Sequence, residues 1–363
     1  MSAIGRNTIY NLAGLGIPLL LFIVTIPLYI HLIGAARFGV LSIVWLVLGL
    51  FGMLDLGLGR AATQKIAKLK HGSAEDRRGA LGTALVSNAA IGTAGALIML
   101  GAGYYLFAHG MKLEPRLRAE AIPVVPLMAI GVPVVTSIGI LTGALQGRER
   151  FFVTNRIAIT NAALFQLLPI GVAWVLGPTL WPLVLAALCA RLLAVVALWL
   201  ECRREFGGVS LRHWSRDDMV AMLRYGGWVT GAAVIGIVLV FSDRFIIGAA
   251  LGAVAVTVYT VAIDATVRVS LVSNALMTAI FPQFAESPGN IAALADKASR
   301  YLFAIATPAI VFGILVSDVV FPFWLGDEIG FPSAEVAKIS LVGTDVTPSF
   351  PPAGIRAGPR CCA

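Results

Sequence analysis

The sequence contains few of the residues that enzymes use for chemistry. Charged residues make up 13% of its 363 positions, and there are four cysteines and four histidines. The histidines, at 31, 71, 109 and 213, are too dispersed for a zinc motif. No Gly-Lys dipeptide occurs, which excludes the nucleotide-binding phosphate loop and an intrinsic ATPase. We therefore expect no enzyme activity, no metal and no other cofactor.

Apolar residues dominate the composition. Hydrophobic residues account for 58% of the chain, and its mean hydropathy is +0.89. Because a bilayer core of about 30 Å needs about 20 apolar residues in a helix, long apolar runs are candidate spans. Nine complete runs are predicted, at 8–30, 39–59, 80–108, 121–146, 157–177, 181–200, 226–251, 257–281 and 301–325, and a tenth begins near Ala334 and ends at about Gly343. None alternates as a barrel strand would, so the predicted fold is an all-α, polytopic membrane helix bundle.

Lysine and arginine indicate the orientation. With the N-terminus inside, inner segments carry 17 of these residues and the outer loops four. Since cytoplasmic loops are enriched in basic residues, we expect a cytoplasmic N-terminus, with the first span kept as an anchor. The net charge of +8 is then explained by topology and contact with anionic membrane lipids, not by nucleic-acid binding.

The longest inner loop divides the chain into two predicted lobes. We expect an N-terminal lobe of six spans over 1–200, a cytoplasmic linker at 201–218 and a partial C-terminal lobe over 219–343. Residues 32–36 (LIGAA) align with 250–254 (ALGAV), and both follow a span that runs outward. Six intervening spans would give two repeats of the same polarity, facing one central cavity.

Six short motifs occur in a characteristic order. They are LIGAARFG at 32–39, LDLGLG at 54–59, SDRFIIG at 242–248, VYTVA at 258–262, FPQF at 281–284 and WLGD at 324–327. Over residues 4–343 the chain resembles the polysaccharide-biosynthesis, or O-antigen, flippases of the multidrug/oligosaccharidyl-lipid/polysaccharide exporter superfamily. The resemblance implies 12 to 14 spans in two lobes and alternating access across the bacterial inner membrane. It also implies a lipid-linked (polyprenyl-pyrophosphate) oligosaccharide substrate for O-antigen, capsule or exopolysaccharide synthesis, with polysaccharide-assembly proteins as further partners.

This chain departs from the family pattern after its ninth complete span. Residues 344–363 contain four prolines and can neither span a membrane nor pack a core. We expect a truncated or frame-shifted reading, with a genuine disordered tail as the alternative. An inactive truncated flippase and a drug or cation antiporter are the alternative functions. A polysaccharide polymerase or ligase would need a larger outer loop than 109–120.

Cations inside the spans are the main candidates for substrate binding. Arg191 has five apolar neighbours on each side, so its side chain should point into a cavity. Arg244 and Arg268 are the other candidate cavity cations, and Asp264 lies one helical turn from Arg268. All three cations could bind a pyrophosphate or an acidic sugar.

Acidic residues in the spans allow two readings. Asp243, Arg244, Asp264 and Arg268 could form a neutral network, in which Arg244 pairs with Asp264, that holds the second lobe together. Asp55 and Asp318, near span ends, could serve in capping or packing, or could carry protons for coupling.

Small and polar residues in the spans also have two readings. Gly139, Gly143 and Gly147 share one face of the fourth predicted span, where they would permit close helix approach. Asn88, Asn161, Gln166 and Asn274 could bridge helices or contact sugar hydroxyls.

Overall fold

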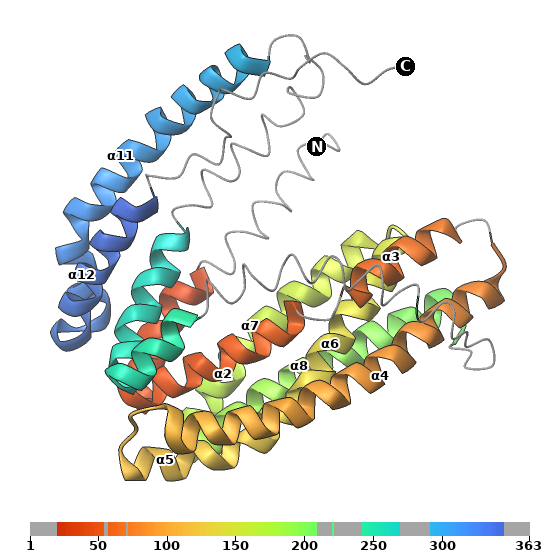
Figure 1. The fold of residues 1–363 in the computed structure, drawn as a ribbon, viewed down its shortest axis with the longest axis horizontal. Helices are drawn as coiled ribbons and strands as arrows, with labels where there is room; N and C mark the ends of the chain where they lie inside the picture. The colour runs from red at the N-terminus through yellow and green to blue at the C-terminus, as the bar shows by residue number, and fades with distance from the viewer. Residues whose placement is uncertain are drawn as a thin grey trace. The chain divides into compact units, whose positions relative to one another are not determined.

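The computed structural model describes residues 20–53, 57–69, 72–208, 220, 242–268 and 291–344. Within these ranges the chain forms helices and no strand, which confirms the all-α fold (Figure 1). In the part of the chain that the structure describes, five helical segments are long and apolar enough to cross a membrane: Ala35–Gly52, Ala74–Gly110, Pro115–Gly147, Phe151–Leu176 and Leu180–Phe206. A shorter apolar helix, Leu20–Ile33, precedes them.

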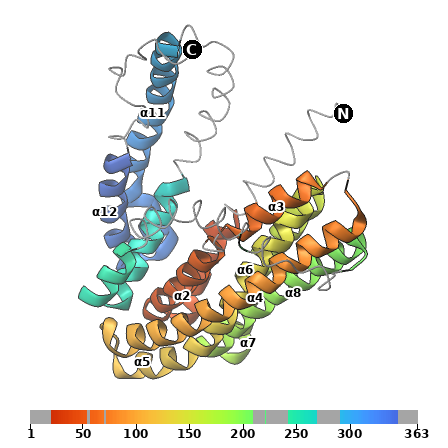
Figure 2. The same ribbon diagram turned by 45° about the vertical axis from the view of Figure 1, so that its right-hand side comes forward.

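The part of the structure that carries most contacts is a bundle built around one central helix. Its helices are α2 (Ala35–Met53), α3 (Leu58–Lys68), α4 (Ala74–Tyr105), α6 (Val125–Gly147), α7 (Phe151–Leu176) and α8 (Leu180–Phe206). Helix α6 contacts each of the others, and Figures 1 and 2 show α4 and α8 running alongside it. Three short elements, the π-helical turn Leu106–Gly110, α5 (Pro115–Ala121) and the 3-10 turn Ile122–Val124, connect α4 to α6.

Several of the predicted span boundaries differ from the helix ends, and two of these differences matter for the site or the second unit. The apolar run 39–59 is not one helix, because α2 ends at Met53 and α3 begins at Leu58 after Gly57, whose φ is 68°. That left-handed conformation cannot continue a right-handed helix, and it redirects the chain. The tenth helix, α12 (Asp327–Thr344), begins before the expected Ala334, directly after Gly326.

The chain divides into two compact units, Met1–Thr257 and Val258–Ala363. Residues 242–257 belong to the first unit because they contact its helices directly. The Thr257 hydroxyl donates to the Ala35 carbonyl at 2.6 Å, and the Lys112 ammonium donates to the Ala250 carbonyl at 2.8 Å. Part of the predicted linker at 201–218 lies outside the described residues, so the two lobes and their boundary stay a prediction.

The two segments of the predicted repeat share one local backbone structure. Gly34 has a φ of 80° and Gly252 a φ of 90°, and each lies between a helix that ends and a helix that begins. The Phe38 N–H donates to the Gly34 carbonyl at 3.0 Å, and the Val256 N–H donates to the Gly252 carbonyl at 3.3 Å. The alignment of 32–36 with 250–254 therefore extends to backbone conformation.

The second unit contains α11 (Ile291–Leu325) packed against α12. The Lys338 ammonium on α12 lies 2.6 Å from the Asp318 carboxylate on α11. Helix 253–268 joins this pair through the hydroxyls of Thr266 and Ser340, which are 3.1 Å apart.

Candidate functional site

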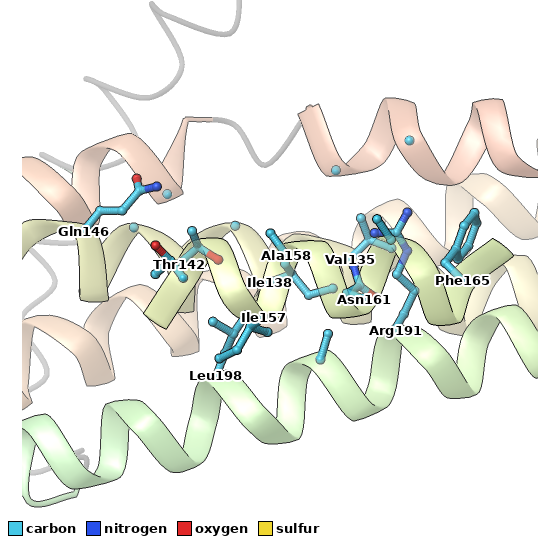
Figure 3. A pocket seen from close by; sticks show the side chains of 18 of the residues that line it. Val135, Ile138, Thr142, Gln146, Ile157, Ala158, Asn161, Phe165, Arg191 and Leu198 are labelled. Atoms are coloured by element: carbon cyan, nitrogen blue, oxygen red, sulfur yellow. The ribbon is translucent and has the colours of Figure 1, made fainter. Parts of the chain in front are cut away.

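Five helices of the first unit line an elongated, partly open cavity of about 640 Å³ (Figure 3). Residues of α2, α3, α6, α7 and α8 line it. Along α6 the lining runs from Val135 to Gln146, about 16 Å at the rise of an α-helix. The cavity therefore extends over roughly half the thickness of a bilayer core.

Arg191 on α8 lies at one end of this cavity. Its guanidinium carbon is 4.3 Å from the centre of the Phe165 ring on α7, a cation–π contact. Its Nε is buried and has no hydrogen-bond partner among the described residues. Figure 3 shows Arg191, Phe165 and Asn161 together at this end. A cation in this setting retains donors for an incoming anionic group.

Aromatic residues surround the Arg191 end of the cavity. The Trp45 ring lies 5.6 Å from that of Phe165 and 5.1 Å from that of Tyr29. The Tyr29 hydroxyl donates to the Gln166 carbonyl at 2.6 Å, and the Thr25 hydroxyl donates to the Gln166 side-chain oxygen at 2.7 Å. These contacts attach helix Leu20–Ile33 to α7 and hold the Phe165 ring in place.

The four polar candidates differ in what they do. The Asn88 amide donates to Ser137 Oγ at 2.9 Å, so Asn88 bridges α4 and α6, and Gln166 bridges helices as described above. Asn161 lines the cavity, and its buried Oδ1 has no hydrogen-bond partner among the described residues. Asn274 lies outside the described residues. The Asn88 Oδ1 also has no hydrogen-bond partner among the described residues, but Asn88 does not line the cavity, whereas Asn161 does.

Arg60, at the other end of the cavity, was not among the predicted site residues. The sequence placed it in an inner loop, as one of many topology-determining cations. Because the chain turns at Gly57, Arg60 instead lies in the first turn of α3 and lines the cavity, as do Gly59 and Gln146. Arg60 and Arg191 are the charged residues in the described lining, which contains no carboxylate.

Arg244 and Arg268 are not among the residues that line this cavity. Asp243 and Arg244 are half-buried at the start of helix 242–250, in the first unit. Asp264 and Arg268 are half-buried in helix 253–268, and the Asp264 carboxylate attracts the Arg268 guanidinium. Roles for these four residues in a central cavity or a charge network stay predictions, as does the pairing of Arg244 with Asp264. Asp55 lies outside the described residues.

The pairing of Asp264 with Arg268 can be tested by a double-mutant cycle. Asp264→Asn and Arg268→Gln should together destabilise the protein less than either change alone, because each single change leaves one charge unpaired at low dielectric. The expected coupling is about 1 kcal/mol in the free energy of unfolding, measured by thermal unfolding in detergent. As a control, Asp264→Asn combined with Arg203→Gln, in the other unit, should give additive losses. Additive losses for the first pair would show that the two side chains do not interact.

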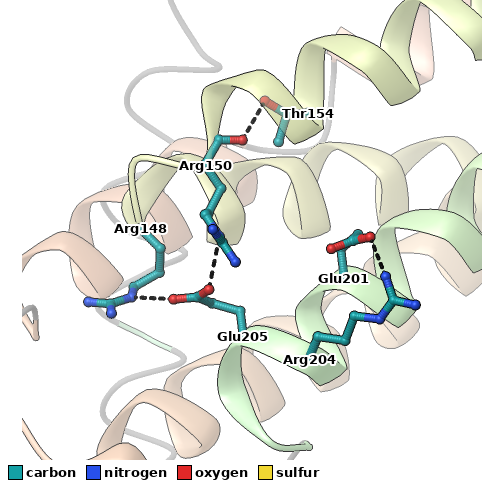
Figure 4. A network of polar contacts seen from close by, with 6 residues as sticks. All are labelled: Arg148, Arg150, Thr154, Glu201, Arg204 and Glu205. Atoms are coloured by element: carbon teal, nitrogen blue, oxygen red, sulfur yellow. Dashed lines mark hydrogen bonds and ion pairs between the residues drawn. The ribbon is translucent and has the colours of Figure 1, made fainter.

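Ion pairs fix the helix ends on both sides of the bundle. Arg37 at the start of α2 makes two hydrogen bonds of 2.7 Å to the Glu120 carboxylate on α5. At the opposite end, Arg148 and Arg150 contact the Glu205 carboxylate of α8 at 3.1 and 3.0 Å (Figure 4). The turn between α6 and α7 is thereby attached to the end of α8, which sets the register of the two helices that carry Asn161 and Arg191.

Residues 4–287 match the family described as polysaccharide biosynthesis protein. The chain belongs to this family. It is also 24% identical over 349 residues to a Shigella flexneri protein named "Putative O-antigen transporter", and the match covers 93% of this chain and 80% of that relative.

Solved structures show the same fold for this polysaccharide biosynthesis protein. An inward-facing multidrug resistance transporter of the MATE family, in the MOP superfamily, matches with a TM-score of 0.73 at 17% identity, over 92% of this chain and 81% of its own. A MOP superfamily transporter from Pyrococcus furiosus matches with a TM-score of 0.60 at 19% identity. The match covers 93% of this chain and 77% of that transporter. The predicted family is confirmed, and the chain has the fold of a multi-pass membrane transporter.

Proposed function

We propose that this protein translocates a lipid-linked oligosaccharide from the inner to the outer leaflet of the bacterial inner membrane by alternating access. The observation that carries the proposal is the Arg191 side chain, which is held against Phe165 at the end of the cavity and has a buried Nε without a hydrogen-bond partner among the described residues. Such a group favours a ligand that brings a negative charge into the bundle.

The chemistry of the lining fits a charged glycan. A guanidinium binds phosphate or carboxylate oxygens through two parallel hydrogen bonds. Asn161 can accept a hydrogen bond from a sugar hydroxyl, since its Oδ1 has no partner in the described structure. The volume of about 640 Å³ lies within the range of ligand-binding cavities. Together these features suit a pyrophosphate or an acidic sugar with hydroxyl groups beside it.

The distribution of lysine and arginine gives the direction of entry. Arg60 and Gln146 lie at the end of the cavity that the predicted orientation assigns to the cytoplasm. An anionic head group entering from that side meets Arg60 first and Arg191 second. The cavity therefore offers two cationic contacts along its length, in the order in which an inward-facing transporter would load its substrate.

The charged residues of the described lining suit an anionic ligand better than the substrate of a drug or cation antiporter. A cavity for organic cations needs carboxylates or other negative charge, and in the described lining the two charged residues are both arginines. The likeness to a multidrug transporter establishes a common fold and not a common substrate.

Reconstitution of the purified protein in liposomes tests the proposal. A fluorescent polyprenyl-pyrophosphate-linked disaccharide in the outer leaflet should exchange between leaflets faster than in protein-free liposomes, as measured by quenching with a membrane-impermeant reductant. Parallel liposomes loaded with ethidium serve as the comparison. Faster ethidium release without lipid-linked glycan exchange would overturn the proposal and support the antiporter.

A further inference from the structure

A second hollow lies on the other side of α7 and α8. It is a groove of about 390 Å³ between the two helices. Its own lining residues, those not shared with the cavity, are Arg156, Thr160, Leu164, Ala190, Leu193 and Ala197. One end of the groove is therefore charged and the rest is mostly apolar.

The groove and the cavity share a wall. Ile157 and Asn161 of α7 and Ala194 of α8 line both spaces. Two of these three side chains are small or polar, and the Asn161 side-chain oxygen has no hydrogen-bond partner among the described residues. A single layer of side chains thus separates the cavity that contains Arg191 from a groove on the outside of the α7–α8 pair.

The surface around the groove has the character of a lipid-facing surface. Leu193, in the groove, is 53% exposed, and the neighbouring Leu192 and Val196 are 41% and 52% exposed. Because this helix belongs to a membrane span, these exposed apolar side chains are expected to face acyl chains. The groove would therefore open to the bilayer and not to water.

Charge is placed at one end of this groove. Arg156 is exposed and lies about 7 Å along α7 from its first residue, at the end that the predicted orientation assigns to the cytoplasm. From Arg156 to Leu164 the groove runs about 12 Å along α7. A cation near the membrane surface, followed by an apolar channel directed toward the bilayer centre, matches an anionic lipid whose chain descends from its phosphate.

We propose that the α7–α8 groove is the binding site for the polyprenyl phosphate part of the substrate. The prenyl chain lies along Leu164, Leu193 and Ala197, its phosphate contacts Arg156, and the attached glycan enters the cavity from its cytoplasmic end, past Arg60. This inference rests on the proposed translocation, since only a lipid that carries a glycan needs both spaces at once. An ordinary phospholipid carries no glycan, so it would occupy the groove without the cavity.

Site-specific crosslinking tests the occupant of the groove. The photocrosslinking amino acid p-benzoylphenylalanine is placed at Leu193, inside the groove, or at Leu192, its exposed neighbour outside the groove. The full-length protein is reconstituted with radiolabelled polyprenyl phosphate in phosphatidylethanolamine and phosphatidylglycerol vesicles and irradiated. Labelling at position 193 should exceed that at 192 several-fold, and Arg156→Gln should reduce it.

Two outcomes would overturn the groove proposal. One is equal labelling at positions 192 and 193. The other is loss of labelling at 193 when phosphatidylglycerol is added in excess, which would make the groove a general phospholipid site. Thermal unfolding of each crosslinking variant shows whether it is folded before irradiation.

The leaflet-exchange assay separates this proposal from the proposed function. If the wild-type protein exchanges the lipid-linked disaccharide but positions 192 and 193 label equally, the groove proposal fails and translocation stands. If position 193 labels specifically but no exchange occurs, the lipid site stands and translocation fails. Leu193→Trp, which fills the groove, should slow exchange several-fold, while the matched Leu192→Trp should leave it unchanged.

Discussion

Replacing Arg191 with alanine is expected to abolish translocation of the lipid-linked oligosaccharide without preventing membrane insertion. The substitution removes the cation at the deep end of the cavity, together with its contact with Phe165. A hydrogen bond to a charged group contributes about 1.5–3 kcal/mol, and a bidentate pair loses two of them. The expected loss is at least about 100-fold in the rate of exchange, which in a flippase-deficient strain should appear as absence of surface glycan.

Two further variants make the Arg191 result specific. Arg191→Lys keeps the charge but not the planar donor pair, so it should retain part of the activity. Arg203→Ala, on an exposed position of the same helix, should retain all of it. Alanine at 191 removes the cation–π contact with Phe165 but also a partly buried charge whose Nε has no hydrogen-bond partner among the described residues, so the thermal unfolding midpoint should change little. Normal glycan display by Arg191→Ala would remove this residue from the mechanism.

The expectation that Arg191 faces a cavity rested on local information, and its role in substrate binding stays a prediction. A charged side chain with five apolar neighbours on each side cannot easily reach water, and facing lipid would cost it several kcal/mol of free energy in any fold. The same local reasoning identifies the spans, since an apolar run that forms a helix makes all of its backbone hydrogen bonds within its own segment. Local composition is therefore sufficient for the fold class and for one end of the cavity.

Arg60 could not be predicted in the same way. Its position in the cavity depends on the turn at Gly57, and an apolar run does not reveal that one glycine within it adopts a φ of 68°. The glycines of the LDLGLG motif are the signal that was available, because closely spaced glycines are common where a helix is interrupted.

Asp318 and Asn161 illustrate a second limit. The ion pair of Asp318 with Lys338 forms between α11 and α12. Asn161 lines both the cavity and the groove because of the way α7 packs against α8. Pairwise packing of helices is set by side chains far apart in the sequence, so no local pattern contains it. The functional surfaces of this protein arise at such contacts, which is why its spans were easier to predict than its site.

The packing of α3 against α6 leads to the second large expected effect. Gly143 and Gly147, two of the three glycines predicted to share a helix face, contact α3, and Gly139 and Gly143 line the cavity. A Cβ at Gly143 would overlap the Gly59 carbonyl and lie 2.9 Å from Thr63 Oγ1. The Thr63 hydroxyl itself lies 2.9 and 3.0 Å from the carbonyl oxygens of Gly59 and Gly143, so there is no space into which α3 can relax without losing these contacts.

Gly143→Ala should therefore destabilise the bundle by about 3 kcal/mol, the upper end of the usual cost of overpacking. The clash is with backbone, which cannot rotate away as a side chain can. Thermal unfolding in detergent should show a clearly lowered midpoint. Gly101→Ala, on α4 with no atom within 4 Å of the added methyl group, should keep or slightly raise the midpoint, because alanine favours a helix by up to about 1 kcal/mol over glycine. An unchanged midpoint for Gly143→Ala would mean that α3 and α6 do not approach as closely as this structure places them.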